Sequence, residues 1–135
     1  MALVNWTDNY SVDIKEIDAQ HKKLVAMINT LHEAMSTGKG KDTVVPILDN
    51  LLAYTRTHFN NEEQLFTRHA YPARDQHTRI HNSLAQQVID LKSKMNAGAN
   101  ILPVEVMEFM RDWLTSHIMA EDKKYAPFLK SKGVQ

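Results

Sequence analysis

Apolar residues recur at spacings of three and four along most of the chain, which is the period of an amphipathic α-helix. Four such stretches are separated by the few glycines and prolines of the sequence. We expect helices from about residue 18 to 38, from 42 to 71, from 73 to 98, and from 103 onward. Asp18 is expected to cap the first helix, and the Tyr71-Pro72 step is expected to end the second.

Helices of similar length joined by short loops pack as antiparallel neighbours. The predicted fold class is therefore all-α, an up-down-up-down four-helix bundle with its apolar faces turned inward. With 135 residues and 43% hydrophobic content, residues 1–135 are expected to form one domain around a single core. Pro127 lies in a short C-terminal segment that is expected to add a separate turn of helix.

Charge balance and the absence of cysteine narrow the classes of function. Lys plus Arg and Asp plus Glu number 16 each, so no net charge favours nucleic acid or an anionic membrane surface. Without cysteine, the chain has no disulfides, thiolate metal sites, iron–sulfur clusters or thiol nucleophiles, and any metal must bind nitrogen and oxygen. The sequence shows neither a leader pattern nor a run of about 18 apolar residues, so we expect a cytoplasmic protein without membrane insertion.

Histidine and carboxylate residues stand at spacings that place them on the inner faces of the expected helices. Pairs four residues apart in the second and third helices share one helical face, about one turn apart. His117 and Asp122 in the fourth helix are five residues apart, which is a rotation of about 140° in an α-helix. We therefore expect a local break in the helix near Ala120. The candidate metal ligands are His21, His58, Glu62, His77, His81, His117 and Asp122.

Each of these signals alone has an ordinary explanation, such as a hydrogen-bonded core histidine, a surface ion pair or a chance histidine pair. Together they place five imidazoles in one layer of the interior, where an unpaired polar group costs about 1 to 3 kcal/mol. Five imidazoles and two bridging carboxylates exceed one octahedral ion and suit two. With one bridging oxo or hydroxo group, they fill eleven of the twelve positions and leave one open. Imidazole suits iron, copper, nickel and zinc alike, so donor chemistry alone leaves the metal undecided.

Five segments carry a resemblance to a known family. They are IDAQH at 17–21, HFNNEE at 58–63, YP at 71–72, HTRIH at 77–81 and WLTSHIMAED at 113–122. With these motifs, nearly the whole chain resembles the hemerythrin family, and within it the single-domain bacterial type, the bacteriohemerythrins.

The resemblance implies two iron ions that bind dioxygen reversibly. It implies His77, His81 and His117 on one iron, His21 and His58 on the other, and the two carboxylates as bridges, with the two-histidine iron keeping the open position. An apolar pocket is expected around that position, walled by Leu24, Phe59, Trp113, Leu114 and Met119. Gln20 and Glu63 are candidates for orienting ligand imidazoles from outside.

Two other functions are compatible with a bundle of this kind. A di-iron oxidase or peroxidase of the ferritin-like type uses several glutamates and Glu-x-x-His motifs, whereas here histidine outnumbers carboxylate five to two. An O2 or iron sensor module would be fused to a signalling domain. We therefore expect a non-enzymatic oxygen-binding protein that transports or stores O2, or delivers it to an oxygen-consuming enzyme.

Overall fold

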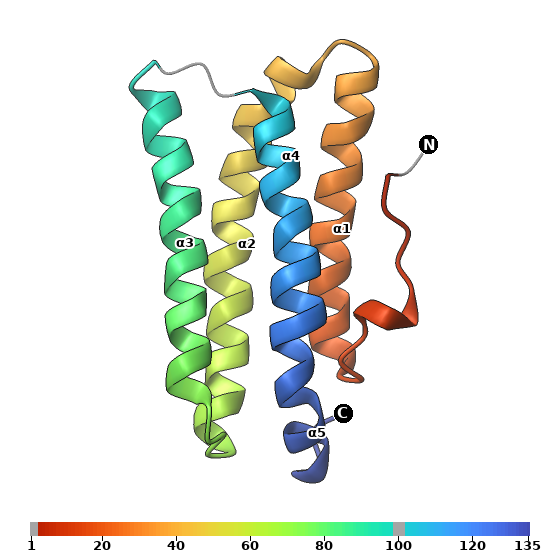
Figure 1. Cartoon of the computed structure of the whole chain (residues 1–135), viewed down its shortest axis with the longest axis vertical. Helices are drawn as coiled ribbons and strands as arrows, with labels where there is room; N and C mark the ends of the chain where they lie inside the picture. The colour runs from red at the N-terminus through yellow and green to blue at the C-terminus, as the bar shows by residue number, and fades with distance from the viewer. Residues whose placement is uncertain (1–2, 99–101) are drawn as a thin grey trace.

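The computed structural model describes residues 3–98 and 102–135, whose regular elements are helices. A short 3-10 helix, η1 (Asp8–Tyr10), precedes the long helices α1 (Lys15–Ser36), α2 (Gly40–Arg68) and α3 (Arg74–Asn96). The last part of the bundle comprises α4 (Pro103–Asp112), the π-helical segment η2 (Trp113–Asp122) and α5 (Lys123–Ser131). In Figure 1, α1, α2, α3 and the continuous rod formed by α4 and η2 lie side by side, with α5 at the lower end of the α4–η2 rod. The predicted all-α antiparallel four-helix bundle is confirmed.

The helix boundaries differ from the expected ones by at most three residues, as at the start of α1 and the end of α2. This helix begins at Lys15, and Ile14 rather than Asp18 occupies the N-cap position. The Asp18 carboxylate instead accepts hydrogen bonds from Ser11 Oγ at 2.5 Å and from the Val12 backbone N–H at 2.8 Å. Asp18 therefore ties the preceding loop to the first turn of the helix.

The N-terminal arm lies along α1 (Figure 1). The Val4 backbone N–H donates to Asn29 Oδ1 at 2.9 Å, and Asn29 Nδ2 donates to the Val4 carbonyl at 2.8 Å. In the described ranges, no helix combines the length and apolar character that crossing a bilayer requires.

Two clusters of buried apolar side chains fill the bundle. The larger runs through its middle and upper part and includes Leu24, Phe59 and Ile118. The smaller lies towards the α5 end and includes Ile17, Phe66 and Tyr125. On α1, on α2, and between η2 and α5, only a few residues separate members of the two clusters, and these positions include His21, Glu62 and Asp122.

Candidate metal centre

A layer of buried histidine and carboxylate side chains separates the two apolar clusters. On α1, His21 lies between Ile17 of the smaller cluster and Leu24 of the larger one. All seven residues singled out in the sequence are brought together in this layer, and none is more than 4% exposed. They are His21, His58, Glu62, His77, His81, His117 and Asp122.

The two oxygens of Asp122 face different histidines. Oδ1 lies 2.9 Å from Nε2 of His77 and 3.0 Å from Nε2 of His117. Oδ2 lies 3.1 Å from Nε2 of His21. Asp122 thus lies between two groups of imidazoles and directs one oxygen at each.

Glu62 contacts histidines through a single oxygen. Its Oε1 lies 3.1 Å from Nε2 of His58 and 3.2 Å from Nε2 of His81. The nitrogens His21 Nε2 and His58 Nε2 are themselves 3.0 Å apart. All five histidines therefore turn the same ring nitrogen, Nε2, towards the carboxylates.

These contacts have the spacing of metal ligands rather than the geometry of hydrogen bonds. Glu62 Oε1, both Asp122 oxygens, and Nε2 of His77, His81 and His117 are buried with no hydrogen-bond partner among the described residues. Two donors at right angles on one ion, each about 2.1 Å from it, are about 3.0 Å apart. The observed separations of 2.9 to 3.2 Å match that value, so the donor set fits metal ions at its centre.

The charge of the cluster also favours cations. Burial and the neighbouring Asp122 charge act to raise the pKa of Glu62, but His58 and His81 outweigh them and hold this pKa well below its usual range. Burial raises the pKa of Asp122 as well, and contacts led by His117 hold it well below its usual range. Both carboxylates are therefore anionic, which is the state that binds a metal ion.

Two of the histidines are oriented from outside the cluster. His58 Nδ1 lies 2.5 Å from Gln20 Oε1, and His81 Nδ1 lies 3.0 Å from Glu63 Oε2. An acceptor at Nδ1 keeps the proton there and leaves the Nε2 lone pair free for a metal ion. Burial lowers the pKa of His81, but its contacts with Glu62 and Glu63 outweigh burial and raise the pKa to about 9. Without metal, His81 is therefore a cation near neutral pH.

The five-residue spacing of His117 and Asp122 is accommodated by the π-helical segment η2. The expected break near Ala120 is wrong, since the backbone stays helical from Trp113 through Asp122. In a π-helix the hydrogen bonds join residues five apart, so one turn is wider than in an α-helix. His117 and Asp122 therefore stand about one turn apart, and both side chains point into the bundle.

Four of the five expected pocket residues lie beside the cluster in the larger apolar core, each at most 5% exposed. They are Leu24, Phe59, Trp113 and Leu114. The fifth, Met119, is half-buried and lies outside this core, whereas its neighbour Ile118 is fully buried within it. Because η2 turns Ile118 inward, we replace Met119 by Ile118 as the candidate wall residue.

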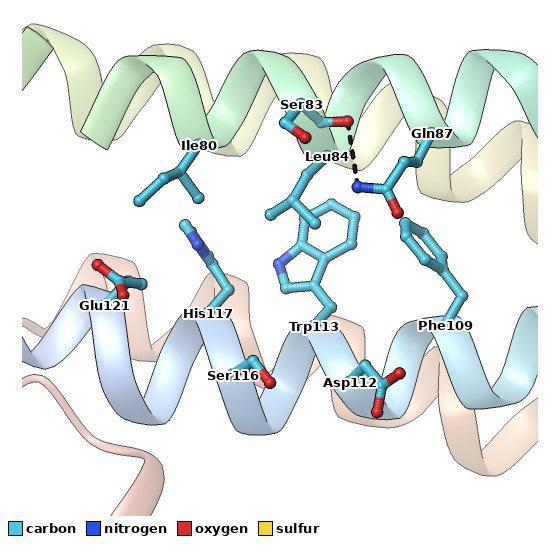
Figure 2. A pocket seen from close by; sticks show the side chains of 10 residues that line it. All are labelled: Ile80, Ser83, Leu84, Gln87, Phe109, Asp112, Trp113, Ser116, His117 and Glu121. Carbon is cyan, nitrogen blue, oxygen red and sulfur yellow. Dashed lines mark hydrogen bonds between the residues drawn. The ribbon is translucent and has the colours of Figure 1, made fainter. Parts of the chain in front are cut away.

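A cleft of about 400 Å³ separates α3 from the α4–η2 rod and reaches His117. Figure 2 shows Ile80 and Leu84 of α3 facing His117 and Trp113 across it, with Phe109 further along. The cleft lies on the side of His117, not of His21 and His58. His21 and His58 do not line this cleft and are at most 1% exposed.

Two tyrosines near the cluster were missed in the sequence. The Tyr125 hydroxyl donates a hydrogen bond to Glu62 Oε2, and the Tyr54 ring stacks on the His58 ring with centroids 5.1 Å apart. Burial raises the pKa of both tyrosines, so both hydroxyls stay protonated. Tyr125 could have been found because it stands three residues after Asp122, on the same helical face.

Fold and site together define a cation-binding four-helix bundle with a histidine-rich cluster in its core. The family model described as the hemerythrin HHE cation binding domain matches residues 12–129. The chain belongs to the hemerythrin family, which confirms the resemblance carried by the sequence motifs.

Individual relatives match along nearly the whole chain. A bacteriohemerythrin of Stenotrophomonas maltophilia is 33% identical over 97% of this chain and 84% of its own length. A bacteriohemerythrin of Methylococcus capsulatus is 33% identical over 97% of this chain and all of its own. A crystal structure described as wild-type hemerythrin superimposes with a TM-score of 0.85 at 33% identity, covering 95% of this chain and 98% of its own.

Proposed function

We propose that the seven side chains hold two iron ions and that the protein binds dioxygen reversibly at this pair. The observation that carries the proposal is that the donors form two groups sharing both carboxylates. One group is Glu62, His77, His81, His117 and Asp122, and the other is His21, His58, Glu62 and Asp122. In each group the candidate ligand atoms lie within 4.8 Å of one another.

The unequal sizes of the two groups indicate where a small ligand enters. Five protein donors and one bridging oxygen make six ligands, which fill the six positions of an octahedron. Four protein donors and the same bridge leave one position open, on the side of His21 and His58. An iron pair in this site would supply two electrons that O2 takes up on binding and returns on release.

The surrounding side chains keep water away from the open side. His21 and His58 are at most 1% exposed, and Leu24, Phe59 and Ile118 of the larger apolar cluster are each at most 5% exposed. A dry pocket would slow the loss of the bound ligand in a reduced form, which would leave the metal pair oxidised. These residues therefore favour reversible binding over turnover, and we propose transport, storage or delivery of O2 to an oxygen-consuming enzyme as the role.

Anaerobic reconstitution with ferrous iron tests the proposal. Iron is counted per chain, and optical spectra are then recorded through cycles of air and inert gas. Two irons per chain, with an absorption band that appears with O2 and disappears on deoxygenation, are expected. A band that forms once and does not reverse, with turnover of an added reductant, would favour an oxidase or peroxidase instead.

A further inference from the structure

The two oxygens of Glu62 have different neighbours. Oε1 faces the Nε2 atoms of His58 and His81, one from each donor group. Oε2 accepts the hydrogen bond from the Tyr125 hydroxyl. Asp122, by contrast, directs one oxygen at each side of the cluster and accepts no hydrogen bond among the described residues. The two candidate bridging carboxylates are therefore not equivalent.

Tyr125 is held firmly in this position. It is fully buried, and its ring packs with Phe66, Tyr71 and His77 at centroid distances of 5.1, 6.5 and 5.5 Å. It lies in α5, directly after the segment that supplies Asp122. The segment from Asp122 to Tyr125 thus places the Asp122 carboxylate in the cluster and the Tyr125 hydroxyl against the Glu62 carboxylate. A buried tyrosine hydroxyl needs an acceptor, and here that acceptor is Glu62.

We propose that Tyr125 is a positioning residue that fixes how Glu62 binds the metal pair and keeps the pair in its reduced state. This inference rests on the proposed function. The hydrogen bond restrains the rotation of the Glu62 carboxylate and leaves Oε1 turned to both donor groups. It also withdraws negative charge from Glu62, as a hydrogen bond to an ionised acceptor does. Since the more highly charged ferric state depends more on anionic ligands, a weakened carboxylate favours the ferrous state.

The first test is Tyr125→Phe, which removes the hydroxyl and keeps the ring. Tyr71→Phe is the matched control, because Tyr71 belongs to the same aromatic cluster and is 8% exposed, but no hydrogen bond joins it to Glu62 or Asp122 in the described part of the chain. Iron content, reduction potential and the magnetic coupling of the two ferric ions are measured. A role limited to packing would not move the potential or the coupling.

The expected result is that Tyr125→Phe still binds two irons but oxidises about tenfold faster in air. Its reduction potential falls by the equivalent of a tenfold change in equilibrium constant, about 59 mV for one electron. The magnetic coupling changes because Glu62 can rotate, while Tyr71→Phe behaves as wild type. Wild-type potential and coupling in Tyr125→Phe would overturn the inference.

A second variant covers the case in which Tyr125→Phe fails to fold. 3-Fluorotyrosine placed at position 125 is a stronger hydrogen-bond donor of nearly the same size, and it should raise the potential. A potential that is unchanged or lower contradicts the inference. The same samples separate the two proposals. A wild-type protein that does not cycle with O2 overturns both, whereas a cycling wild type with an unaffected Tyr125→Phe variant overturns only the role of Tyr125.

Discussion

Raising the pH should destabilise the metal-free protein, because folding stabilises the charged form of His81. The pKa of this histidine is raised to about 9 in the fold, mainly by Glu62 and Glu63 acting against burial. An unfolded histidine titrates near about 6.5, and a difference of about 2.5 units corresponds to about 3 kcal/mol of stability. That stability is fully present below about pH 6.5 and is lost as the pH rises through about 9.

Urea unfolding of the metal-free protein, followed by far-ultraviolet circular dichroism at several pH values, measures this loss. Glu63→Gln is the control, since it removes the charge 3.0 Å from His81 Nδ1 and should reduce the loss. In addition, a metal ion must displace the His81 proton, so metal affinity should fall with decreasing pH below about 9. A free energy of unfolding that is constant or increases between about pH 6.5 and about 9 would refute this reasoning.

Three further predictions concern the metal pair and its pocket. His77→Ala and His117→Ala each remove a donor from the larger group and should bring iron, counted by mass spectrometry, well below two per chain; retention of both irons would contradict their assignment. Ile118→Ala should lower the free energy of unfolding by about 2 to 5 kcal/mol and speed autoxidation, whereas Met119→Ala should do neither. Faster autoxidation in Met119→Ala than in Ile118→Ala would restore Met119 to the pocket. Glu62→Gln should lose the magnetic coupling of the ferric pair even if iron remains, and an unchanged coupling would remove it as a bridge.

The bundle could be predicted from the sequence because helical periodicity and short connections leave few alternatives. The first residue of α1 could not be predicted from the sequence, because an aspartate such as Asp18 can have two roles that the sequence does not distinguish. An aspartate can occupy the N-cap position of a helix. Asp18 instead lies inside the first turn and accepts hydrogen bonds from the loop that precedes the helix. The choice depends on whether Ser11 and Val12 can reach it, which is a property of the folded loop.

The cluster was predicted from residue types and spacing, but the backbone that positions it was not. The five-residue interval between His117 and Asp122 is compatible with a break or with a π-helix, and only packing on both sides of η2 decides between them. The same choice determines whether Ile118 or Met119 faces inward. Tyr125 was missed because its partner, Glu62, is 63 residues away in the sequence.

A gas titration that counts O2 against iron tests the central claim most directly. The reduced, iron-loaded protein is equilibrated with a known amount of O2, and the gas released on purging with argon is measured. The unequal donor groups, which leave one open position on the side of His21 and His58, predict one O2 taken up and one returned for every two irons. Uptake without release, or uptake in another ratio, would contradict a reversible di-iron oxygen site.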